Sequence, residues 1–596
     1  MHRLILSLLA LLSAGIALVY AKPASPNPIP HRQADGSIIE ILKHGDEKAH
    51  IVTTTDSLPL ISQNGSFYYA TLSTSGSPVS SGIVAKSPSL RSADESKVIA
   101  TLRPKETLNT YASLLSSGKR AQTRGPGLMP TKFPSIGDPK ALVILVQFTD
   151  VKFTGENPRE FFERELNQEG FSDYDATGSA KDWFIANSNG LFRPQFDVYG
   201  PVSLPRSMAY YGANNAQGND IRAVKMIIAA CGALDREINY ADYDTDNDGI
   251  IDNVFIYYAG YGEADYADPN CIWPHSWSLQ EAGEEAPVLD GCTLNHYACS
   301  SEINGSTHCP DGIGTFVHEF SHVLGLPDLY NTTYASTSAG TPFTPGAYST
   351  LDIGPYNNNG RTPPNYSSYE RYALGWMEPL ILSKSENCEL PPLAESNKAY
   401  IVKSLDSKEY YLFENRQQTG NDLYIPGHGM LVWHIDYDER IFARNEVNNN
   451  AAHQYVDLVE ADGSQIDRDR ANDLFPGAAR ATTFSSSSRP RFSFWSGEAP
   501  PVSLHFITED NSNITFRAVK KGDNPNDDPE ASVSDITDSG EPFFTLSGRI
   551  LSPQCPVDIY SLQGSLIACG VTADTPLDSG VYIILSGDRQ AKIIVR

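Results

Sequence analysis

The stretch GTFVHEFSHVLGLPDLY, residues 314–330, constrains the fold more than any other part of the chain. Its apolar residues predict a buried helix, on which His318 and His322 project from one face and can bind one metal ion. A glycine and a proline follow shortly after: the glycine allows a left-handed helix end, and the proline prevents the helix from continuing. The chain must therefore turn back, and this turn can carry Asp328 to the metal.

Glu319 directly follows the first histidine. Its carboxylate can face a water molecule on the metal without binding the metal, which is the geometry of a general base in zinc peptidases. Two imidazoles and one carboxylate with an open fourth position are what a catalytic zinc ion requires. We therefore predict His318, His322 and Asp328 as zinc ligands. The alternative is a buried helix whose two histidines bind only backbone carbonyl groups.

A second acidic stretch, DYDTDNDGIID at residues 242–252, predicts a calcium loop. Acidic residues occupy alternate positions, a glycine allows a sharp turn, and another aspartate follows at the ninth position. Phe255 stands at the twelfth position where an EF-hand has glutamate, so we expect a shorter calcium loop, with a solvated acidic turn as the alternative. The expected ligands are Asp244, Asp246, Asp248 and Asp252.

The charge balance argues against nucleic acid as a partner. The chain has 45 Lys and Arg against 72 Asp and Glu, a net charge of −27, which would repel a phosphate backbone. Such acidity suits a soluble exported protein, and simple solubility accounts for most of it.

The first residues, MHRLILSLLALLSAGIALVYAK, predict a cleaved signal peptide, since a short basic region precedes an apolar run and small residues. A membrane anchor is the alternative, but it needs about 20 apolar residues and lasting flanks. We expect no stable membrane span. The eight cysteines would then reach an oxidising compartment where disulfides form, and we expect Cys555 and Cys569, the two in the last segment, to pair.

Patterning along the chain predicts a multidomain α+β or α/β protein. Before residue 125, short apolar runs alternate with Ser, Gly and Pro clusters, which indicates a β-rich unit. It ends in a loop with Lys119, Arg120 and Arg124, where proteolytic nicking is expected. From Lys140, apolar strands alternate with helices, and beyond Glu389 short strands dominate. A removable pro-segment is the natural interpretation of the first unit, and a permanent N-terminal domain is the alternative.

The boundaries expected from these shifts in composition are a signal peptide at 1–21, a propeptide at 22–125, a catalytic domain at 126–388, a β-rich companion domain at 389–520, a linker at 521–535 and a C-terminal domain at 536–596.

The chain resembles the immune inhibitor A-like metallopeptidases, relatives of the metzincins in which Asp replaces the third metal-binding His. Besides the histidine motif, the resemblance rests on IWPHSWSL, GPYNNNGRTPPNYSSYERYALGW, PGHGMLVWHID and VDLVEADG, and covers roughly residues 135–500. DGSIIEILKHGDEKAHIVTTTDSLPLI resembles the family's propeptide. The resemblance implies a metzincin-like catalytic domain, zinc on His318, His322 and Asp328, and Glu319 as the base.

One position departs from the family pattern. Metzincin-like enzymes have a Met in a turn beneath the metal, and the aligned residue here is Leu351. Leucine is close to methionine in volume and can keep the apolar floor under the histidines. Ile353 stands in the same turn at a position where a Tyr could have stabilised the oxyanion. The residue with that role is therefore not identified, and Tyr356 is one candidate.

The final segment, from GRILSPQC to KIIVR, resembles the C-terminal sorting domain of the type IX secretion system of Bacteroidetes. The resemblance rests on VDIYSLQG, LDSGVYII and the basic apolar end. An ordinary small β-sandwich accessory domain is the alternative. The resemblance implies the secretion machinery as a partner and the outside of a Gram-negative cell, free or at its surface, as the location.

Together these patterns predict a secreted zinc metalloendopeptidase made as a zymogen, with zinc and calcium as cofactors, proteins and peptides as substrates and its own propeptide as inhibitor. The competing hypothesis is a catalytically silent adhesin or binding protein that keeps a structural metal site. The presence of Glu319 argues against it, because a structural site needs no ionised carboxylate beside an open coordination position.

Overall fold

The structure is a computed structural model, and its chain divides into two compact units, Met1–Ser383 with Glu389–Phe516 and Lys384–Cys388 with Arg517–Arg596. The residues that it describes are 20–21, 23–45, 50–63, 65–73, 78–104, 107–108, 127–129, 131–215, 220–266, 268–333, 341–526, 543–547, 549–561, 566–587 and 589–595. Nearly all of the expected signal peptide, the basic loop around Arg120 and most of the expected linker lie outside these residues. Among the described residues, no helix has the length and apolar character needed to cross a membrane.

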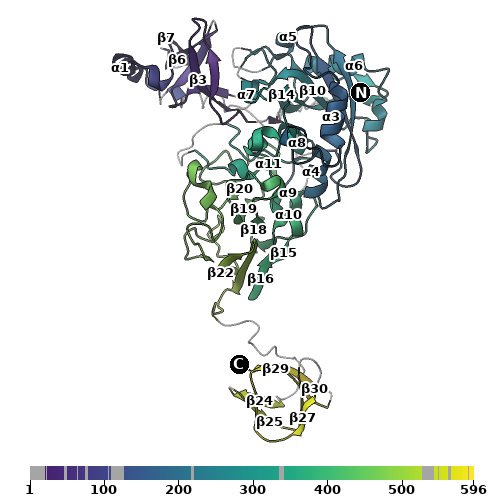
Figure 1. Ribbon diagram of the computed structural model, residues 1–596, viewed down its shortest axis with the longest axis vertical. Coiled ribbons are helices and arrows are strands. Elements are labelled where there is room, and N and C mark those ends of the chain that lie inside the picture. Colours follow the sequence, from purple (N-terminus) through teal and green to yellow (C-terminus); the bar gives the residue numbers. More distant parts are fainter. Residues whose placement is uncertain are drawn as a thin grey trace, which may run out of the picture. The chain divides into compact units, whose positions relative to one another are not determined.

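A six-stranded sheet forms the centre of the α/β part of the first unit, in the order β1-β11-β14-β10-β8-β9. Its strands β14 and β10 are labelled in Figure 1. Strands β14, β10, β8 and β9 run parallel, and β11 and β1 are antiparallel to their neighbours. The strands are β1 (Tyr20–Ala21), β8 (Lys140–Gln147), β9 (Gln195–Ser203), β10 (Val254–Tyr261), β11 (His275–Ser278) and β14 (His296–Ile303).

Helices cover both faces of this sheet, which explains its continuous apolar strands. Val143 and Leu145 of β8 pack in the cluster that includes the helices α3, α4 and α8, whereas Leu142, Ile144 and Val146 pack in the cluster that includes α6. The helices of this part are α3 (Pro158–Asn167), α4 (Ala180–Asn187), α5 (Met208–Gly212), α6 (Ala223–Ala233), α7 (Glu263–Tyr266), α8 (Ile313–Val323) and α9 (Ser368–Ala373). The alternation of strands and helices expected from Lys140 onward is confirmed.

Helix α8 carries the histidine motif and is buried along its whole length. It ends where the sequence predicts, because Gly325 adopts a φ of +94° that residues with a Cβ rarely adopt. A Cβ at this position would lie 2.9 Å from the backbone oxygen of Met129. The glycine therefore permits both the turn and the close approach of the segment that contains Met129.

The residues before the central sheet form a separate antiparallel sheet in the order β2-β3-β4-β5-β6-β7. Ile39 and Ile41 of β3 face one core with Leu60 and Tyr69. The elements are β2 (Ile29–Arg32), β3 (Ile38–Gly45), β4 (His50–Thr54), β5 (Pro59–Gln63), β6 (Ser66–Leu72), β7 (Pro78–Val84) and the helix α1 (Ala93–Thr101). A β-rich N-terminal segment is thus present, as its alternating pattern predicts.

The residues after α9 are mainly strands. Their two sheets have the orders β15-β17-β18-β19-β20 and β16-β23-β22-β21. The elements are β15 (Leu380–Ile381), β16 (Glu386–Leu390), α10 (Leu393–Ser396), β17 (Tyr400–Lys403), β18 (Glu409–Arg416), β19 (Gly429–Asp436), α11 (Glu439–Phe442), β20 (Val456–Leu458), β21 (Thr483–Phe484), β22 (Val502–Asp510) and β23 (Asn513–Lys520). Residues of β17, β18 and β19 share a hydrophobic core with α8, so the companion strands and the α/β part support each other.

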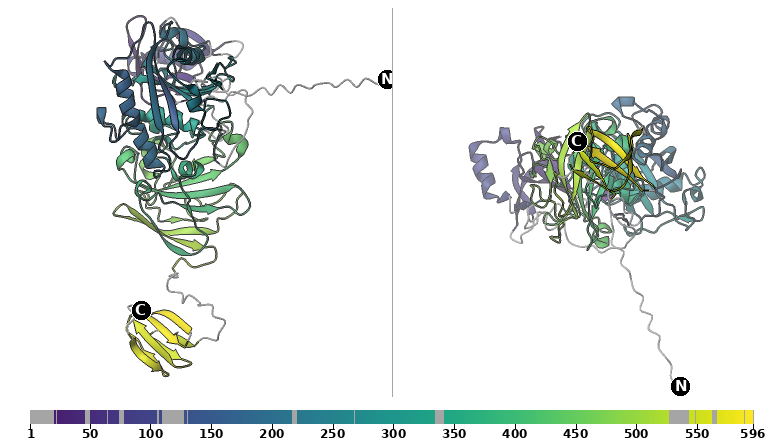
Figure 2. Two further views of the ribbon diagram at one scale, coloured as in Figure 1. Left: turned by 90° about the vertical axis from the view of Figure 1, so that its right-hand side faces the viewer. Right: turned by 90° about the horizontal axis from the view of Figure 1, so that it is seen from below.

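The second unit ends in two small sheets, β24-β25-β28 and β27-β26-β29-β30, seen in yellow in Figure 2. Their inward residues form one apolar cluster. The strands are β24 (Phe544–Ser547), β25 (Ile550–Pro553), β26 (Val557–Ser561), β27 (Leu566–Val571), β28 (Thr575–Pro576), β29 (Gly580–Ser586) and β30 (Arg589–Val595). The whole chain is therefore a mixed α/β protein with several sheets.

The expectation of disulfides is wrong for this structure. All eight cysteines lie among the described residues and none is joined to another. In the last segment, the Sγ atom of Cys555 contacts Ser586 and Arg589, whereas Cys569 is exposed near Asp558. The two thiols thus have different neighbours and do not meet.

Candidate metal centre

The structure brings His318, His322 and Asp328 together at one point. The two Nε2 atoms lie 3.3 Å apart, and Asp328 Oδ1 lies 3.4 Å from Nε2 of His318 and 3.3 Å from Nε2 of His322. Zinc binds nitrogen and oxygen at about 2.0–2.1 Å with tetrahedral angles, which places ligand atoms about 3.3–3.4 Å apart. The three atoms therefore have the spacing of one face of a zinc tetrahedron.

Backbone carbonyl groups fix the orientation of both imidazole rings. Nδ1 of His318 lies 2.8 Å from the carbonyl oxygen of Thr350, and Nδ1 of His322 lies 2.8 Å from that of Leu326. A carbonyl only accepts, so each Nδ1 carries the proton and each Nε2 presents a lone pair. Two lone pairs and a carboxylate oxygen then face one another, an arrangement that calls for a cation between them.

Asp328 is held by Asn445, a residue of the companion part. The Asn445 side chain accepts a hydrogen bond from the Asp328 backbone N–H (2.6 Å) and donates one to Asp328 Oδ2. Oδ1 is buried and has no hydrogen bond in the described structure. Burial opposes ionisation of this side chain, but His322, His318 and Asn445 outweigh burial and lower the pKa of Asp328. The carboxylate is thus ionised and points one oxygen at the histidines.

Glu319 completes the group. Its side chain is fully buried, and a carboxylate oxygen lies within 4.8 Å of the ligand nitrogens of His318 and His322. The carboxylate is thus close enough to the two histidines to reach an ion between them or a molecule bound to that ion.

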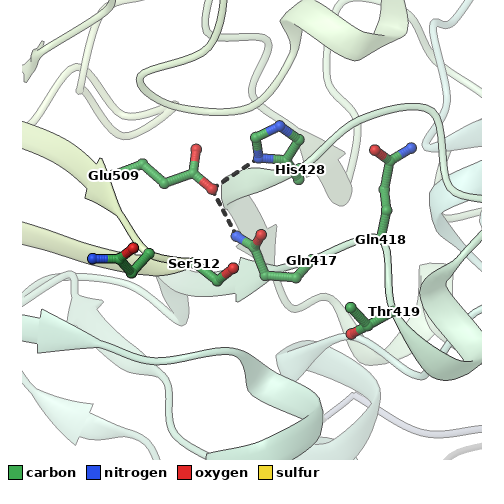
Figure 3. Close-up of a pocket in the computed structure, with 7 residues that line it drawn as sticks. Gln417, Gln418, Thr419, His428, Glu509 and Ser512 are labelled. Atoms are coloured by element: carbon green, nitrogen blue, oxygen red, sulfur yellow. Dashed lines mark hydrogen bonds and ion pairs between the residues drawn. The ribbon is translucent and has the colours of Figure 1, made fainter.

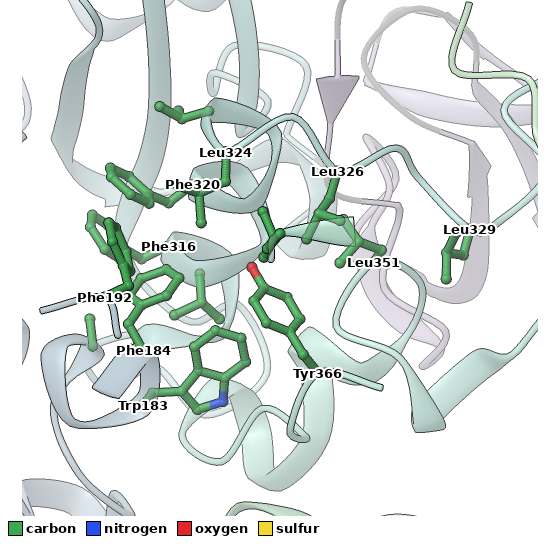
Figure 4. Close-up of a cluster of buried hydrophobic side chains, with 14 of the residues drawn as sticks. Trp183, Phe184, Phe192, Phe316, Phe320, Leu324, Leu326, Leu329, Leu351 and Tyr366 are labelled. Carbon is green, nitrogen blue, oxygen red and sulfur yellow. The ribbon is translucent and has the colours of Figure 1, made fainter. Parts of the chain in front are cut away.

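Leu351 forms part of the apolar floor beside the centre, with Leu326 and Leu329 (Figure 4). Its side chain is fully buried, and its carbonyl oxygen accepts a hydrogen bond from the backbone N–H of Leu329 (2.8 Å). The preceding residue, Thr350, orients His318. The turn with leucine at the expected methionine position therefore still supports the ligands.

Tyr356 lies in the 3-10 helix η5 (Gly354–Gly360), which lies against α8. Its hydroxyl donates a hydrogen bond of 2.6 Å to the carbonyl oxygen of Pro23, in the N-terminal segment. Burial, and then the charges of Asp265, Asp311 and Glu319, raise the pKa of Tyr356 well above its usual value. It is thus a protonated donor, near Glu319, that already binds a peptide carbonyl group.

The acidic loop brings together three of the four aspartates that the sequence predicts. Carboxylate oxygens of Asp244, Asp246 and Asp252 lie within 4.8 Å of one another. Oδ1 of Asp252 is buried without a hydrogen bond, and burial raises the pKa of this residue to about 6. Asp248 is not part of this group, and its carboxylate pairs with the ammonium group of Lys132, which also lies 3.6 Å from Asp246 Oδ2.

A polar hollow on the companion strands contains none of the predicted site residues. In it, Glu509 accepts hydrogen bonds from His428 (2.8 Å) and Gln417 (2.9 Å) (Figure 3). Gln418, Thr419, Asn511 and Ser512 also line it. The Glu509 carboxylate is thus bound by two neighbours, and the described residues of the hollow offer no counterpart to the three facing ligand atoms described above.

Comparison with known proteins agrees with the geometry. Residues 132–377 match the catalytic domain of immune inhibitor A, peptidase M6. The chain is 27% identical over 258 residues to the pre-pro-metalloprotease PrtV of Vibrio cholerae serotype O1, covering 38% of this chain and 25% of that protein. It is 24% identical over 269 residues to immune inhibitor A of Bacillus thuringiensis subsp. alesti, covering 38% of each. The chain thus spans well under half the length of these relatives.

The ligand geometry and these similarities define a catalytic domain of the metallopeptidase class. Residues 132–377 thus resemble the catalytic domain of the peptidase M6, or immune inhibitor A, family.

Proposed function

We propose that the chain is a zinc-dependent metalloendopeptidase that hydrolyses peptide bonds in proteins. The observation that carries the proposal is the spacing of 3.3–3.4 Å among the ligand atoms of His318, His322 and Asp328. The buried carboxylate of Glu319 beside them favours catalysis over the competing hypothesis of a silent adhesin. A purely structural site would not need it.

A zinc ion on these ligands would polarise the substrate carbonyl and lower the pKa of an attacking water molecule. Glu319 takes the proton of that water as it attacks the carbonyl carbon, and passes the proton to the leaving amine. The Tyr356 hydroxyl donates a hydrogen bond to the carbonyl oxygen as its charge develops. The hydrogen bond from Tyr356 to Pro23 supports this role, since Pro23 supplies the same chemical group.

We propose that the segment before the catalytic domain is a propeptide that inhibits by covering the site. The Pro23 carbonyl oxygen of this segment accepts the hydrogen bond of Tyr356, in a helix that lies against α8. The Ser25 backbone N–H donates to the carbonyl oxygen of Ala264 (3.0 Å). The segment thus occupies groups beside α8 that a substrate would use. The name of the Vibrio relative also describes a precursor.

Inhibition by the propeptide is tested on the full chain by replacing Lys119, Arg120 and Arg124 with Gln. The expected result is an uncut, inactive precursor, while the parent is cut and active. An uncut variant with full activity would contradict the proposal.

The acidic loop is proposed to bind calcium through Asp244, Asp246 and Asp252, a hard-cation site of carboxylate oxygens. Calcium should raise the unfolding temperature of the full chain, and Asp252→Asn should remove most of that rise. Asp510→Asn, at an exposed position, serves as control. A rise that is equal in parent and Asp252→Asn would contradict the assignment.

Residues 536–596 are proposed to be a sorting domain that directs export through type IX secretion machinery to the outside of a Gram-negative cell. The sequence resemblance supports it, and the small sheets of this segment are compatible with it. Deleting residues 536–596 should leave the product inside the cell in a Bacteroidetes host. Unchanged export would leave an accessory β-sandwich as the better interpretation.

The peptidase proposal is tested by the hydrolysis of an unfolded protein by the processed product of the full chain. Activity should disappear with a chelator and return with zinc added at one equivalent. Hydrolysis that survives complete metal removal would contradict the proposal.

A further inference from the structure

A lysine of the N-terminal sheet is inserted into an acidic pocket of the catalytic domain. Nζ of Lys43, in β3, donates hydrogen bonds to Oε1 of Glu263 (2.8 Å) and to its backbone oxygen (3.1 Å). Both side chains are almost completely buried, with relative exposures of 3% and 2%. The other carboxylate oxygen of Glu263 accepts a hydrogen bond from Asn214 (2.9 Å). A buried, bidentate grip on an ammonium group is therefore built into this part of the domain.

Asp220 adds a second carboxylate to the pocket. Its Oδ2 accepts a hydrogen bond from the backbone N–H of Trp273 (3.0 Å), while its buried Oδ1 has no hydrogen bond in the described structure. Burial, and then the charge of Glu263, raise the pKa of Asp220 well above its usual value. Burial also raises the pKa of Glu263, although Lys43 lowers it. The ammonium group of Lys43 lowers the pKa of both acidic groups, so the pocket favours a cation beside Glu263.

Trp273 forms an aromatic wall of the pocket. Nζ of Lys43 lies 5.1 Å from the centre of its ring, within the range of a cation–π interaction. The ring of His50, from the N-terminal sheet, stacks on the same tryptophan at 5.0 Å. An aromatic ring that leads to a carboxylate suits a long side chain with a cationic tip. A bare metal ion has no apolar part that could pack on the ring.

The pocket adjoins the segment that binds Tyr356, the residue proposed above to contact the substrate carbonyl group. The N-terminal segment contacts Tyr356 through Pro23 and the backbone of Ala264 through Ser25. These two contacts are two residues apart, which spans about 7 Å in an extended chain. Ala264 directly follows Glu263 in α7. A substrate that follows the same edge would therefore pass the pocket a few residues from the bond that is cleaved.

We infer that Glu263, Asp220 and Trp273 form a substrate subsite that binds a Lys or Arg side chain, and that Lys43 occupies this subsite in the precursor. The inference deepens the proposed peptidase function and rests on it, and on release of the N-terminal segment. When Lys43 leaves, the buried Glu263 loses its counter-charge, and a basic side chain of the substrate restores it. The enzyme then favours substrates with a basic residue at one fixed position near the cleaved bond.

The test uses processed enzyme obtained from the full chain and an unfolded protein whose cleavage sites are sequenced. A matched peptide pair then differs only by Lys or norleucine at the preferred position. We expect kcat/KM to be at least about tenfold higher for the Lys peptide, in line with the coupling measured for close charge pairs at interfaces. Cleavage without any basic preference would overturn the inference and leave the peptidase function intact, whereas no cleavage at all would contradict the peptidase function itself.

The double variant Lys43→Met with Glu263→Gln assigns the preference to the pocket, and it leaves no lone buried ammonium group to disturb folding of the precursor. We expect its preference, the ratio of kcat/KM for the Lys peptide to kcat/KM for the norleucine peptide, to fall to about twofold or less. Lys225→Met with Glu284→Gln, which removes a partly exposed pair of the same kind, is the matched control and should keep the preference. A preference retained in the first double variant would overturn the inference.

Binding gives a readout that does not depend on catalysis. A peptide with the sequence of residues 38–45 and its norleucine-43 analogue are titrated into processed parent protein whose metal has been removed. We expect the analogue to bind at least about tenfold more weakly, and equal binding of the two peptides would overturn the inference.

Discussion

The side chain of Asn445 holds Asp328 at two points, the backbone N–H and the carboxylate oxygen Oδ2. These residues are 117 positions apart, so the companion strands complete the metal centre of the α/β part. The companion part is therefore more than an appendage, because it sets the direction of the third ligand.

Replacing Asn445 with Ala should weaken metal binding by about 10- to 100-fold, the usual effect of losing a group that orients a ligand. Zinc affinity measured against a competing chelator checks this. Asn449→Ala is the matched control, since Asn449 bonds to Thr332 and not to Asp328. Equal affinities in the two variants would contradict the role of Asn445.

Tyr356→Phe should lower kcat of the processed enzyme by about 10²- to 10³-fold with little change in KM, because the hydroxyl acts mainly on the developing negative charge. Zinc content should stay at the parent level. Tyr174→Phe, at an exposed position, should be neutral. A parental kcat in Tyr356→Phe would contradict the catalytic role and would mean that the hydroxyl only binds Pro23.

Leu351→Met should cost less than about 1.5 kcal/mol of unfolding free energy and leave activity near the parent level, since the two side chains are similar in volume. Leu351→Ala should cost about 2–5 kcal/mol by opening a cavity beside the ligands. Denaturant unfolding and peptide hydrolysis measure both effects. A large gain of activity in Leu351→Met would show that leucine impairs the site.

Asp473 should make the chain less stable as the pH rises. Burial, and then the charge of Glu460, raise the pKa of Asp473 to about 8. The folded chain thus holds this proton more tightly than the unfolded chain, and the stabilisation is lost between about pH 4 and pH 8. Asp473→Asn should flatten the fall of the unfolding temperature over this range. Asp406→Asn, on an exposed loop, should leave the fall unchanged, and an equally steep fall in both variants would contradict the assignment.

The sequence predicts those features that depend on local pattern. The buried strand at Lys140, the helix of His318 and the turn to Asp328 follow from apolar runs, spacing and a glycine–proline helix end. Asn445, the carbonyl of Thr350 and the pocket of Lys43 depend on contacts between distant segments, for which no local pattern exists. Likewise, Asp248 follows the expected spacing, but Lys132 of another segment pairs with it. Cys555 and Cys569 share a small unit without sharing a neighbourhood, so counting cysteines gives a pair that the fold does not bring together.

The central claim is that Glu319 acts as the base at a zinc centre formed by His318, His322 and Asp328. The most direct measurement compares hydrolysis of an unfolded protein by the parent chain and by Glu319→Gln. The variant is first freed of its N-terminal segment by the parent enzyme. Bound zinc is quantified in both proteins. We predict one zinc per chain in each protein and a rate at least about 10²-fold lower in Glu319→Gln. Equal zinc with an equal rate would contradict the account.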